Sequence, residues 1–306
     1  MPFVFDGADV RGAEVDLDAT WREVLKRHAY PLHVRSLLGQ AMAAGALLSS
    51  TLKFDGTLVL QTRAEDNAAP VRLMVVECGA DLSMRATAKL GDGIAQTGEH
   101  DASDTQSLAE LVGAGKLVIT LDPREDDKSA YQGVVPLEGE YLGAALEHYM
   151  LRSEQLETRI FLAADENRAA GLLIQKMPDE GGHAKKAGAT ESRWPDAEAL
   201  ASTITSQELL MLEPRDILRC LFHEFDLRLF AERPTAFNCS CSRERVAGML
   251  RALGRAEVDD ILAEQGAVTV NCEFCNQAYG FDSIDAAQLF TAGSAAAKSP
   301  ESGLKH

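Results

Sequence analysis

Two short stretches near the C-terminus, FNCSCSRERV at residues 237–246 and VNCEFCNQAYGF at residues 270–281, are the most informative parts of this sequence. They place Cys239 and Cys241 in one close pair and Cys272 and Cys275 in another. Four soft thiolates in two close pairs match the tetrahedral preference of zinc. The sequence therefore predicts one zinc ion per chain, held by these four cysteines.

The residues between the two pairs predict a small helical module that folds back on itself. Ser242 can cap a helix with apolar residues at helical spacing, and Gly254 can end it. A second short helix ends at Gly266, and a strand then leads into Cys272. The core of such a module is small, so a bound metal, worth on the order of ten kcal/mol, is expected to stabilise its fold.

Two features distinguish this motif from a purely architectural zinc knuckle, which is the more frequent kind of four-cysteine module. A Cys-x-Cys pair is unusual for an architectural site, and a disulfide closed within it would be strained and easily reduced, which suits a regulatory bond. Arg243 and Arg245 stand at a helix N-terminus beside Cys241, where we expect them to favour the thiolate, the form that oxidants attack.

The first part of the chain predicts an α+β domain over residues 1–177. Apolar residues at spacings of three and four predict a helix over 33–53, and a second helix is expected over 137–153. Short β-rich runs separated by Gly, Asp, Asn and Pro predict closely spaced, antiparallel strands. These runs are 57–62, 71–77, 82–90, 116–122, 131–137, 158–165 and 169–177.

The polar, glycine-containing stretch 178–195 predicts a domain boundary. Thr205 and Glu208 have capping-box spacing, and the apolar residues 217–225 form an amphipathic segment that must dock on another part of the protein. We therefore expect a linker and amphipathic helical region over 178–232, a zinc module over 233–290 and a flexible tail over 291–306.

Net charge and the lack of certain sequence patterns argue against several classes of protein. The N-terminal residues lack the pattern of a secretory signal, and no window approaches a membrane span, which predicts a cytosolic protein without a membrane partner. The net charge of −17 argues against binding to nucleic acid. Hydrolase and nucleotide-binding motifs are missing, so no enzyme activity is expected. The two remaining cysteines, Cys78 and Cys220, are predicted to be inert core thiols.

The cysteine motif resembles the redox-switch domain of the heat-shock protein 33 family, the redox-regulated 33-kDa chaperonins. The runs LLGQAMAAGALLSSTLKFDGTLVLQ at residues 37–61 and YQGVVPLEGE and SEQLETR within residues 131–159 resemble the core domain of that family. The likeness extends over nearly the whole chain.

The resemblance implies an ATP-independent holdase for unfolded client proteins, inactive while the reduced cysteines hold zinc. Oxidants would form the disulfides Cys239–Cys241 and Cys272–Cys275, release the metal and unfold the module and the preceding linker. The family works as a homodimer when activated, and the resemblance implies no catalytic centre.

Two other classes remain as alternatives. One is an interaction or nucleic-acid-binding protein with a constitutive zinc ribbon. The other is an enzyme whose zinc module is merely structural. Neither alternative predicts a gain of activity on oxidation.

Overall fold

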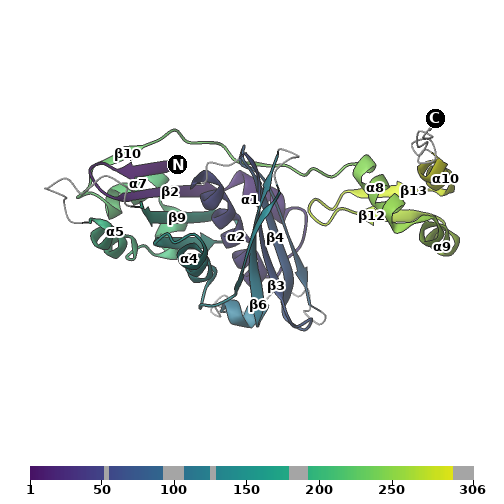
Figure 1. The fold of residues 1–306 in the computed structure, drawn as a ribbon, viewed down its shortest axis with the longest axis horizontal. Coiled ribbons are helices and arrows are strands. Elements are labelled where there is room, and N and C mark those ends of the chain that lie inside the picture. Colours follow the sequence, from purple (N-terminus) through teal and green to yellow (C-terminus); the bar gives the residue numbers. More distant parts are fainter. Residues whose placement is uncertain (52–54, 92–106, 125–128, 179–191, 292–306) are drawn as a thin grey trace, which may run out of the picture. The chain divides into compact units, whose positions relative to one another are not determined.

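The computed structural model describes residues 1–51, 55–91, 107–124, 129–178 and 192–291 of the 306-residue chain. The chain divides into two compact units, Met1–Asn238 and Cys239–His306. Figure 1 shows the elements of each unit. The expected tail over 291–306 lies outside the described residues except for its first residue, and so does most of the expected loop over 178–195.

The N-terminal unit contains a six-stranded sheet in the order β11-β5-β4-β3-β6-β7. Five of its strands pair antiparallel, as predicted from their close spacing. The edge strand β11 is different, because it pairs parallel to β5 and comes from far along the chain. The strands are β3 (Gly56–Ala64), β4 (Val71–Gly79), β5 (Ser83–Leu90), β6 (Gly115–Pro123), β7 (Tyr131–Pro136) and β11 (Ala236–Phe237).

A second sheet of five strands has the order β10-β1-β2-β9-β8, and all its pairs are antiparallel. The antiparallel pairing expected from the close spacing of the runs 158–165 and 169–177 is confirmed, because β8 and β9 form a hairpin. The first two strands were not predicted, because PFVFDGADVRG mixes apolar residues with turn residues within a few positions. The strands are β1 (Pro2–Phe5), β2 (Val10–Leu17), β8 (Thr158–Ala164), β9 (Ala169–Lys176) and β10 (Leu227–Leu229).

Helix α2 (Leu32–Thr51) lies between the two sheets and packs against both, which confirms the helix predicted over 33–53 (Figure 1). Small residues allow this close approach. A Cβ atom at Gly39 would lie only 2.5 Å from the Cβ of Ala164 on β8. Among the described helices, even the 20-residue α2 lacks the combination of length and hydropathy that a membrane span requires.

The second predicted helix is shorter than expected. Helix α4 (Leu142–Ser153) begins five residues after the predicted start at 137. Gly139 adopts φ +118, a backbone conformation that side chains disfavour, so the chain turns there before the helix begins. The remaining helices of this unit are α1 (Ala19–Leu25), α3 (Leu108–Val112), α5 (Trp194–Ala201), α6 (Ser206–Met211) and α7 (Pro214–Leu221).

The predicted amphipathic segment docks on the five-stranded sheet, as expected. Ile217, Leu218 and Leu221 of α7 are buried in a cluster with Phe3 and Phe5 of β1. The helix ends at Leu221, earlier than the apolar spacing suggested. Phe222 nevertheless stays buried and packs edge-on to Phe5, at 4.9 Å between ring centroids. The capping box predicted for α6 is also confirmed, with Glu208 N–H donating to the Thr205 hydroxyl.

The C-terminal unit contains two helices, a β-hairpin and a final helix. Helix α8 (Arg243–Leu253) begins after Ser242 and ends at Gly254, and α9 (Arg255–Gln265) ends at Gly266, as predicted. The hairpin consists of β12 (Val268–Asn271) and β13 (Ala278–Phe281), and α10 (Ser283–Thr291) follows.

Candidate metal centre

The first cysteine pair is fixed by the N-terminus of α8. The Ser242 hydroxyl accepts a hydrogen bond of 3.2 Å from the Arg245 N–H, so the cap residue directly follows Cys241. A helix cap defines the local backbone closely, because it satisfies amides that have no partner inside the helix. The position of Cys241 is therefore coupled to the start of this helix.

The second pair lies in the tight turn between β12 and β13. The Asn276 N–H donates to the Cys272 carbonyl over 2.8 Å, and the Cys272 N–H donates to the Gln277 carbonyl over 2.9 Å. Asn276 takes up the left-handed conformation, φ +59, that closes the turn. Backbone amides of this turn also donate to the sulfurs of Cys272 and Cys275. The turn thus directs both thiols to one side.

The four sulfurs meet at one point of the C-terminal unit. All lie within 4.8 Å of one another, with 3.6 Å between the sulfurs of Cys239 and Cys272 and 3.3 Å between those of Cys241 and Cys275. Four sulfurs around a zinc ion, each about 2.3 Å from it, would be about 3.8 Å apart. The donor set and its spacing therefore fit a tetrahedral metal ion, and none of these four cysteines is joined in a disulfide.

Burial opposes ionisation of the second pair. It raises the pKa of Cys272 above its usual value and that of Cys275 to about 12. Thiols in this environment keep their protons unless a cation compensates the charge, and a metal ion is such a cation. Metal binding at this site would therefore be coupled to the release of protons.

Tyr279 on β13 is a polar neighbour of the site that the sequence did not reveal. Its hydroxyl donates a hydrogen bond to the Cys241 sulfur over 3.1 Å. That hydrogen bond raises the pKa of Tyr279 to about 12, so the hydroxyl remains protonated. One sequence signal could have indicated that Tyr279 lies near the sulfurs. It follows Cys275 by four residues, in a strand that returns past the turn.

The two arginines beside Cys241 have other partners than expected. The Arg243 guanidinium donates to the Gly280 carbonyl over 2.7 Å and to the Asp285 carboxylate over 2.8 Å, and it lies 4.2 Å from the centre of the Phe281 ring. The carboxylate compensates its charge, so Arg243 acts as a connection between α8, β13 and α10. The Arg245 guanidinium donates to the Ser240 hydroxyl over 2.7 Å.

The other two cysteines differ from each other. Cys78 is fully buried, and burial raises the pKa of its thiol to about 11, which agrees with the predicted inert core thiol. Cys220 is exposed on α7, so the same prediction was wrong for it. The apolar residues around Cys220 in the sequence point to the sheet, whereas Cys220 lies on the opposite side of the helix. His223, three residues further on, is exposed as well.

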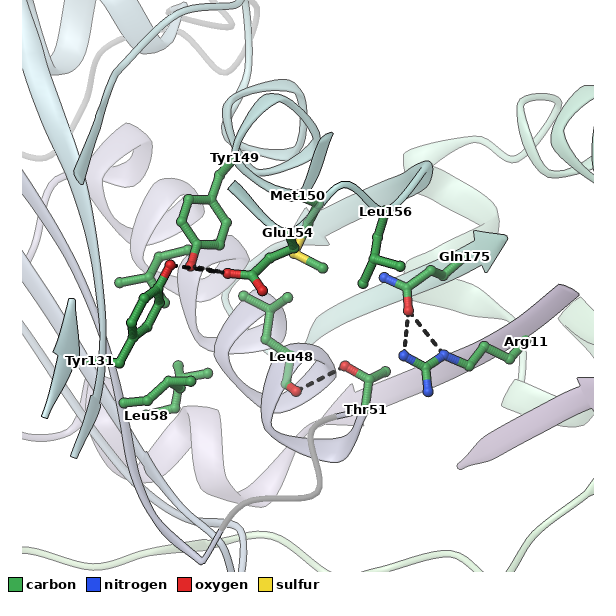
Figure 2. A pocket seen from close by; sticks show the side chains of 12 residues that line it. Arg11, Leu48, Thr51, Leu58, Tyr131, Tyr149, Met150, Glu154, Leu156 and Gln175 are labelled. Atoms are coloured by element: carbon green, nitrogen blue, oxygen red, sulfur yellow. Dashed lines mark hydrogen bonds between the residues drawn. The ribbon is translucent and has the colours of Figure 1, made fainter. Parts of the chain in front are cut away.

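The runs YQGVVPLEGE and SEQLETR meet at a cavity of about 350 Å³ in the N-terminal unit. Figure 2 shows the hydroxyls of Tyr131 and Tyr149 pointing to the Glu154 carboxylate, at 3.5 and 2.8 Å. On another side of the cavity the Arg11 guanidinium donates to the Gln175 side chain. These polar groups bind one another, so the two runs connect β7, α4 and the turn before β8.

Comparison with known proteins gives a consistent result. The family model described as "Hsp33 protein" matches residues 1–282. A 33 kDa chaperonin of Chromobacterium violaceum is 46% identical over 289 residues, covering 94% of this chain and 92% of that protein. A 33 kDa chaperonin of Methylobacillus flagellatus is 47% identical over 290 residues, covering 94% and 93%.

A solved structure shares the fold. The crystal structure of a 33 kDa chaperonin from Thermotoga maritima, a heat shock protein 33 homologue, superimposes with a TM-score of 0.76. The superposition covers 96% of this chain and 98% of that one, at 20% sequence identity. The α+β architecture inferred from the sequence is therefore confirmed.

Proposed function

This chain belongs to the Hsp33 family of chaperones, and on that premise we propose that it is a redox-regulated, ATP-independent holdase. In the reduced state Cys239, Cys241, Cys272 and Cys275 hold one zinc ion, and the chaperone is inactive. The convergence of the four sulfurs within 4.8 Å is the observation that supports this proposal most directly. Zinc would supply a cross-link between the start of the C-terminal unit and the turn between β12 and β13.

Activation begins when an oxidant converts the four thiolates to two disulfides and so removes the metal ligands. We propose the pairs Cys239–Cys241 and Cys272–Cys275. The closest sulfur contacts run across the pairs, from Cys239 to Cys272 and from Cys241 to Cys275. Those cross pairs, however, depend on the folded state of residues 242–271. Partners one or two residues apart need little chain closure and stay close when the unit unfolds.

Peptide mapping of the oxidised protein tests this pairing. Disulfides within the two motifs should predominate. A preponderance of Cys239–Cys272 and Cys241–Cys275, or of Cys241–Cys272, would contradict the proposed pairing while leaving oxidative activation itself possible.

We propose a division into a core of residues 1–177, a linker region of residues 178–232, a switch module of residues 233–290 and a tail at 291–306. The linker region would couple the metal site to client binding. The chain just before Cys239 is attached to the edge of β5, where the Asn238 N–H donates to the Met84 carbonyl over 2.9 Å. Loss of the fold beyond Cys239 would loosen this attachment and then the docked helices. Apolar surface would become available to unfolded clients.

The decisive experiment compares suppression of client aggregation by reduced, zinc-loaded protein and by peroxide-treated protein, both without nucleotide. We expect activity only after oxidation and its loss after reduction with zinc resupplied. A Cys78→Ser, Cys220→Ser double variant is the matched control and should switch like the wild type. Equal activity in both redox states would refute the proposal and favour a constitutive zinc ribbon.

Three further parts of the proposal concern cellular context. The activated form is a homodimer, the protein acts in the cytoplasm, and its partners are unfolding proteins rather than nucleic acid or membranes. Size-exclusion chromatography with light scattering of the reduced and oxidised protein tests the first of these.

A further inference from the structure

The cavity of about 350 Å³ in the N-terminal unit is lined by residues of both large sheets and by the C-terminal end of α2. Arg11 of β2 and Gln175 of β9 come from the five-stranded sheet, and Leu58 of β3 comes from the six-stranded sheet. Cavities that bind small molecules have volumes of about 300–1,000 Å³, so this cavity has room for a small ligand. The lining residues indicate the chemistry of that ligand.

The positive charge of Arg11 lacks a counter-ion among the residues that the structure describes. Its Nε and Nη2 donate to the Gln175 side-chain oxygen over 2.9 and 2.5 Å, but that amide is neutral. Figure 2 shows the third nitrogen, Nη1, pointing away from Gln175. The guanidinium is half-buried, and burial lowers the pKa of Arg11 below its usual value because no described carboxylate offsets the lost hydration. A bound anion would compensate this charge.

Buried hydrogen bonds hold the guanidinium in one orientation. Gln175 is 1% exposed, and its Nε2 donates to the Thr158 hydroxyl over 2.9 Å, so its oxygen faces Arg11. The Thr158 hydroxyl in turn donates to the Leu156 carbonyl over 3.2 Å. The edge formed by the two terminal nitrogens of Arg11 is therefore available as a fork. Such a fork pairs with a carboxylate through two parallel hydrogen bonds.

Most of the remaining lining is aliphatic. Six side chains from α2, β3, β6, α4 and the turn before β8 contribute it, and all six belong to the main core or pack against it: Leu48, Leu58, Ile119, Leu121, Met150 and Leu156. The Thr51 hydroxyl also lines the cavity, but it donates to the Leu48 carbonyl over 2.9 Å. This part of the cavity therefore suits a hydrocarbon chain, which gains free energy when it leaves water.

Glu154, the other charged residue of the lining, needs no ligand. Its carboxylate is exposed to solvent and accepts hydrogen bonds from the Tyr149 and Tyr131 hydroxyls over 2.8 and 3.5 Å. Figure 2 shows this group on a different side of the cavity from Arg11. Because like charges repel, Glu154 disfavours an anionic group on its own side and directs the carboxylate of a ligand to Arg11.

We propose that this cavity binds a medium-chain fatty acid, whose carboxylate pairs with the Arg11 guanidinium and whose hydrocarbon chain lies against the aliphatic lining. Charge complementarity selects the head group, and the apolar residues select the chain. The inference is independent of the proposed redox function, because every group that it uses lies in the N-terminal unit and the test uses reduced protein throughout.

Isothermal titration calorimetry of the reduced full-length chain tests the site, with decanoate below its micelle concentration as the probe. Decanoate should bind once per chain. Decanol and decyltrimethylammonium have the same chain without the carboxylate, so they should bind at least about tenfold more weakly. No binding of decanoate, or equal affinity for decanol, would overturn the proposal.

Two substitutions remove the uncompensated charge in different ways. Arg11→Met deletes the guanidinium and keeps an unbranched side chain, whereas Gln175→Glu keeps the guanidinium and gives it an internal counter-ion. Each should weaken decanoate binding about tenfold or more and leave the weak binding of decanol unchanged. The matched control is Arg63→Met, at an exposed position on β3, which should bind decanoate like the wild type.

A third substitution tests the position of the chain without changing Arg11. Leu156→Trp fills part of the cavity and should weaken decanoate and decanol to a similar extent. If Arg11→Met does not fold, Gln175→Glu and Leu156→Trp decide the question. Wild-type affinity for decanoate in the folded variants would mean that the fatty acid binds to another apolar surface, and the proposal would be wrong.

Discussion

The two units of this protein are stabilised in different ways. In the N-terminal unit, α2 lies between two sheets, and a second apolar cluster covers the outer face of one of them. In the C-terminal unit, the buried core among the described residues consists of only Ala247, Leu250, Val258, Val268, Phe281, Ala286 and Leu289. A core of that size is marginal without additional cross-links. The comparison indicates that apolar burial can stabilise the first unit by itself, whereas the second unit needs a further source of stability, for which the cluster of four thiols is the candidate.

Metal removal should have the largest effect on folding stability, and that loss of stability should be confined to the C-terminal unit. Zinc contributes on the order of ten kcal/mol to small modules of this type. After anaerobic chelation, amide exchange in α8, α9 and the β12–β13 hairpin should become fast, while α2 and both large sheets stay protected. Four of the six thiols should become accessible to alkylation.

A Cys239→Ser, Cys272→Ser variant should reproduce this state without a chelator. Its hydrogen exchange in the N-terminal unit serves as the internal control. Stoichiometric zinc retained by the double variant would refute the assignment of these residues as ligands.

Undocking of α7 should have the next largest effect. It perturbs the N-terminal unit while the C-terminal unit keeps its zinc. Leu221 is buried and Phe225 packs against the same cluster, so Leu221→Asp with Phe225→Asp should cost about 3–5 kcal/mol of docking energy. We expect an apolar-surface dye to bind and client aggregation to be partly suppressed while zinc is still bound.

The matched control for this variant is Met211→Asp, because Met211 lies at the end of the neighbouring helix α6 and is 69% exposed. It should behave like the reduced wild type. If the double variant keeps its zinc and neither dye binding nor aggregation suppression exceeds the wild type, the docked helices do not gate activity.

Removal of the Arg243 side chain should have a smaller effect, limited to the C-terminal unit. Arg243→Ala removes a stacking contact with Phe281 and a solvent-screened ion pair with Asp285, and their loss should destabilise this unit modestly. In a denaturant titration monitored by zinc release, the transition should occur at a lower denaturant concentration than in the wild type. Arg251→Ala, at an exposed position near the end of the same helix, should leave that transition in place.

Loss of one helix cap should have the smallest effect and gives the sharpest comparison of the two units. Ser242→Ala should destabilise the start of α8 by about 1 kcal/mol, and zinc affinity should fall about fivefold. Thr205→Ala removes an equivalent cap from α6, at about the same local cost, in the unit with the large core. Zinc competition assays should detect the first change and not the second. Equal effects would mean that the units are not energetically separate.

Local patterns in the sequence predicted most elements of the fold. The helix between the sheets and the strands β3 to β9 have clear periodicity, and α8 and α9 of the C-terminal unit have clear periodicity and end signals. β1 and β2 lacked such a pattern, and β11 pairs with a strand about 150 positions earlier, which local periodicity cannot indicate. At the site, cysteine spacing indicated the four sulfurs. The directions of Arg243 and Tyr279 could not be predicted, because both depend on the pairing of β12 with β13.

The turn at Gly254 has a consequence for how this sequence could be lengthened. The glycine adopts φ +102 between α8 and α9, and nothing lies within 4 Å of a Cβ atom built on it. The 11-residue helix α8 spans about 16 Å, so this turn lies at the opposite end of the helix from Ser242. Residues inserted there would extend an exposed helical connection without moving either end at the sulfurs. We therefore expect an insertion at this turn to be tolerated, although it lengthens the sequence between the two cysteine pairs, whereas an insertion within either pair would displace a sulfur.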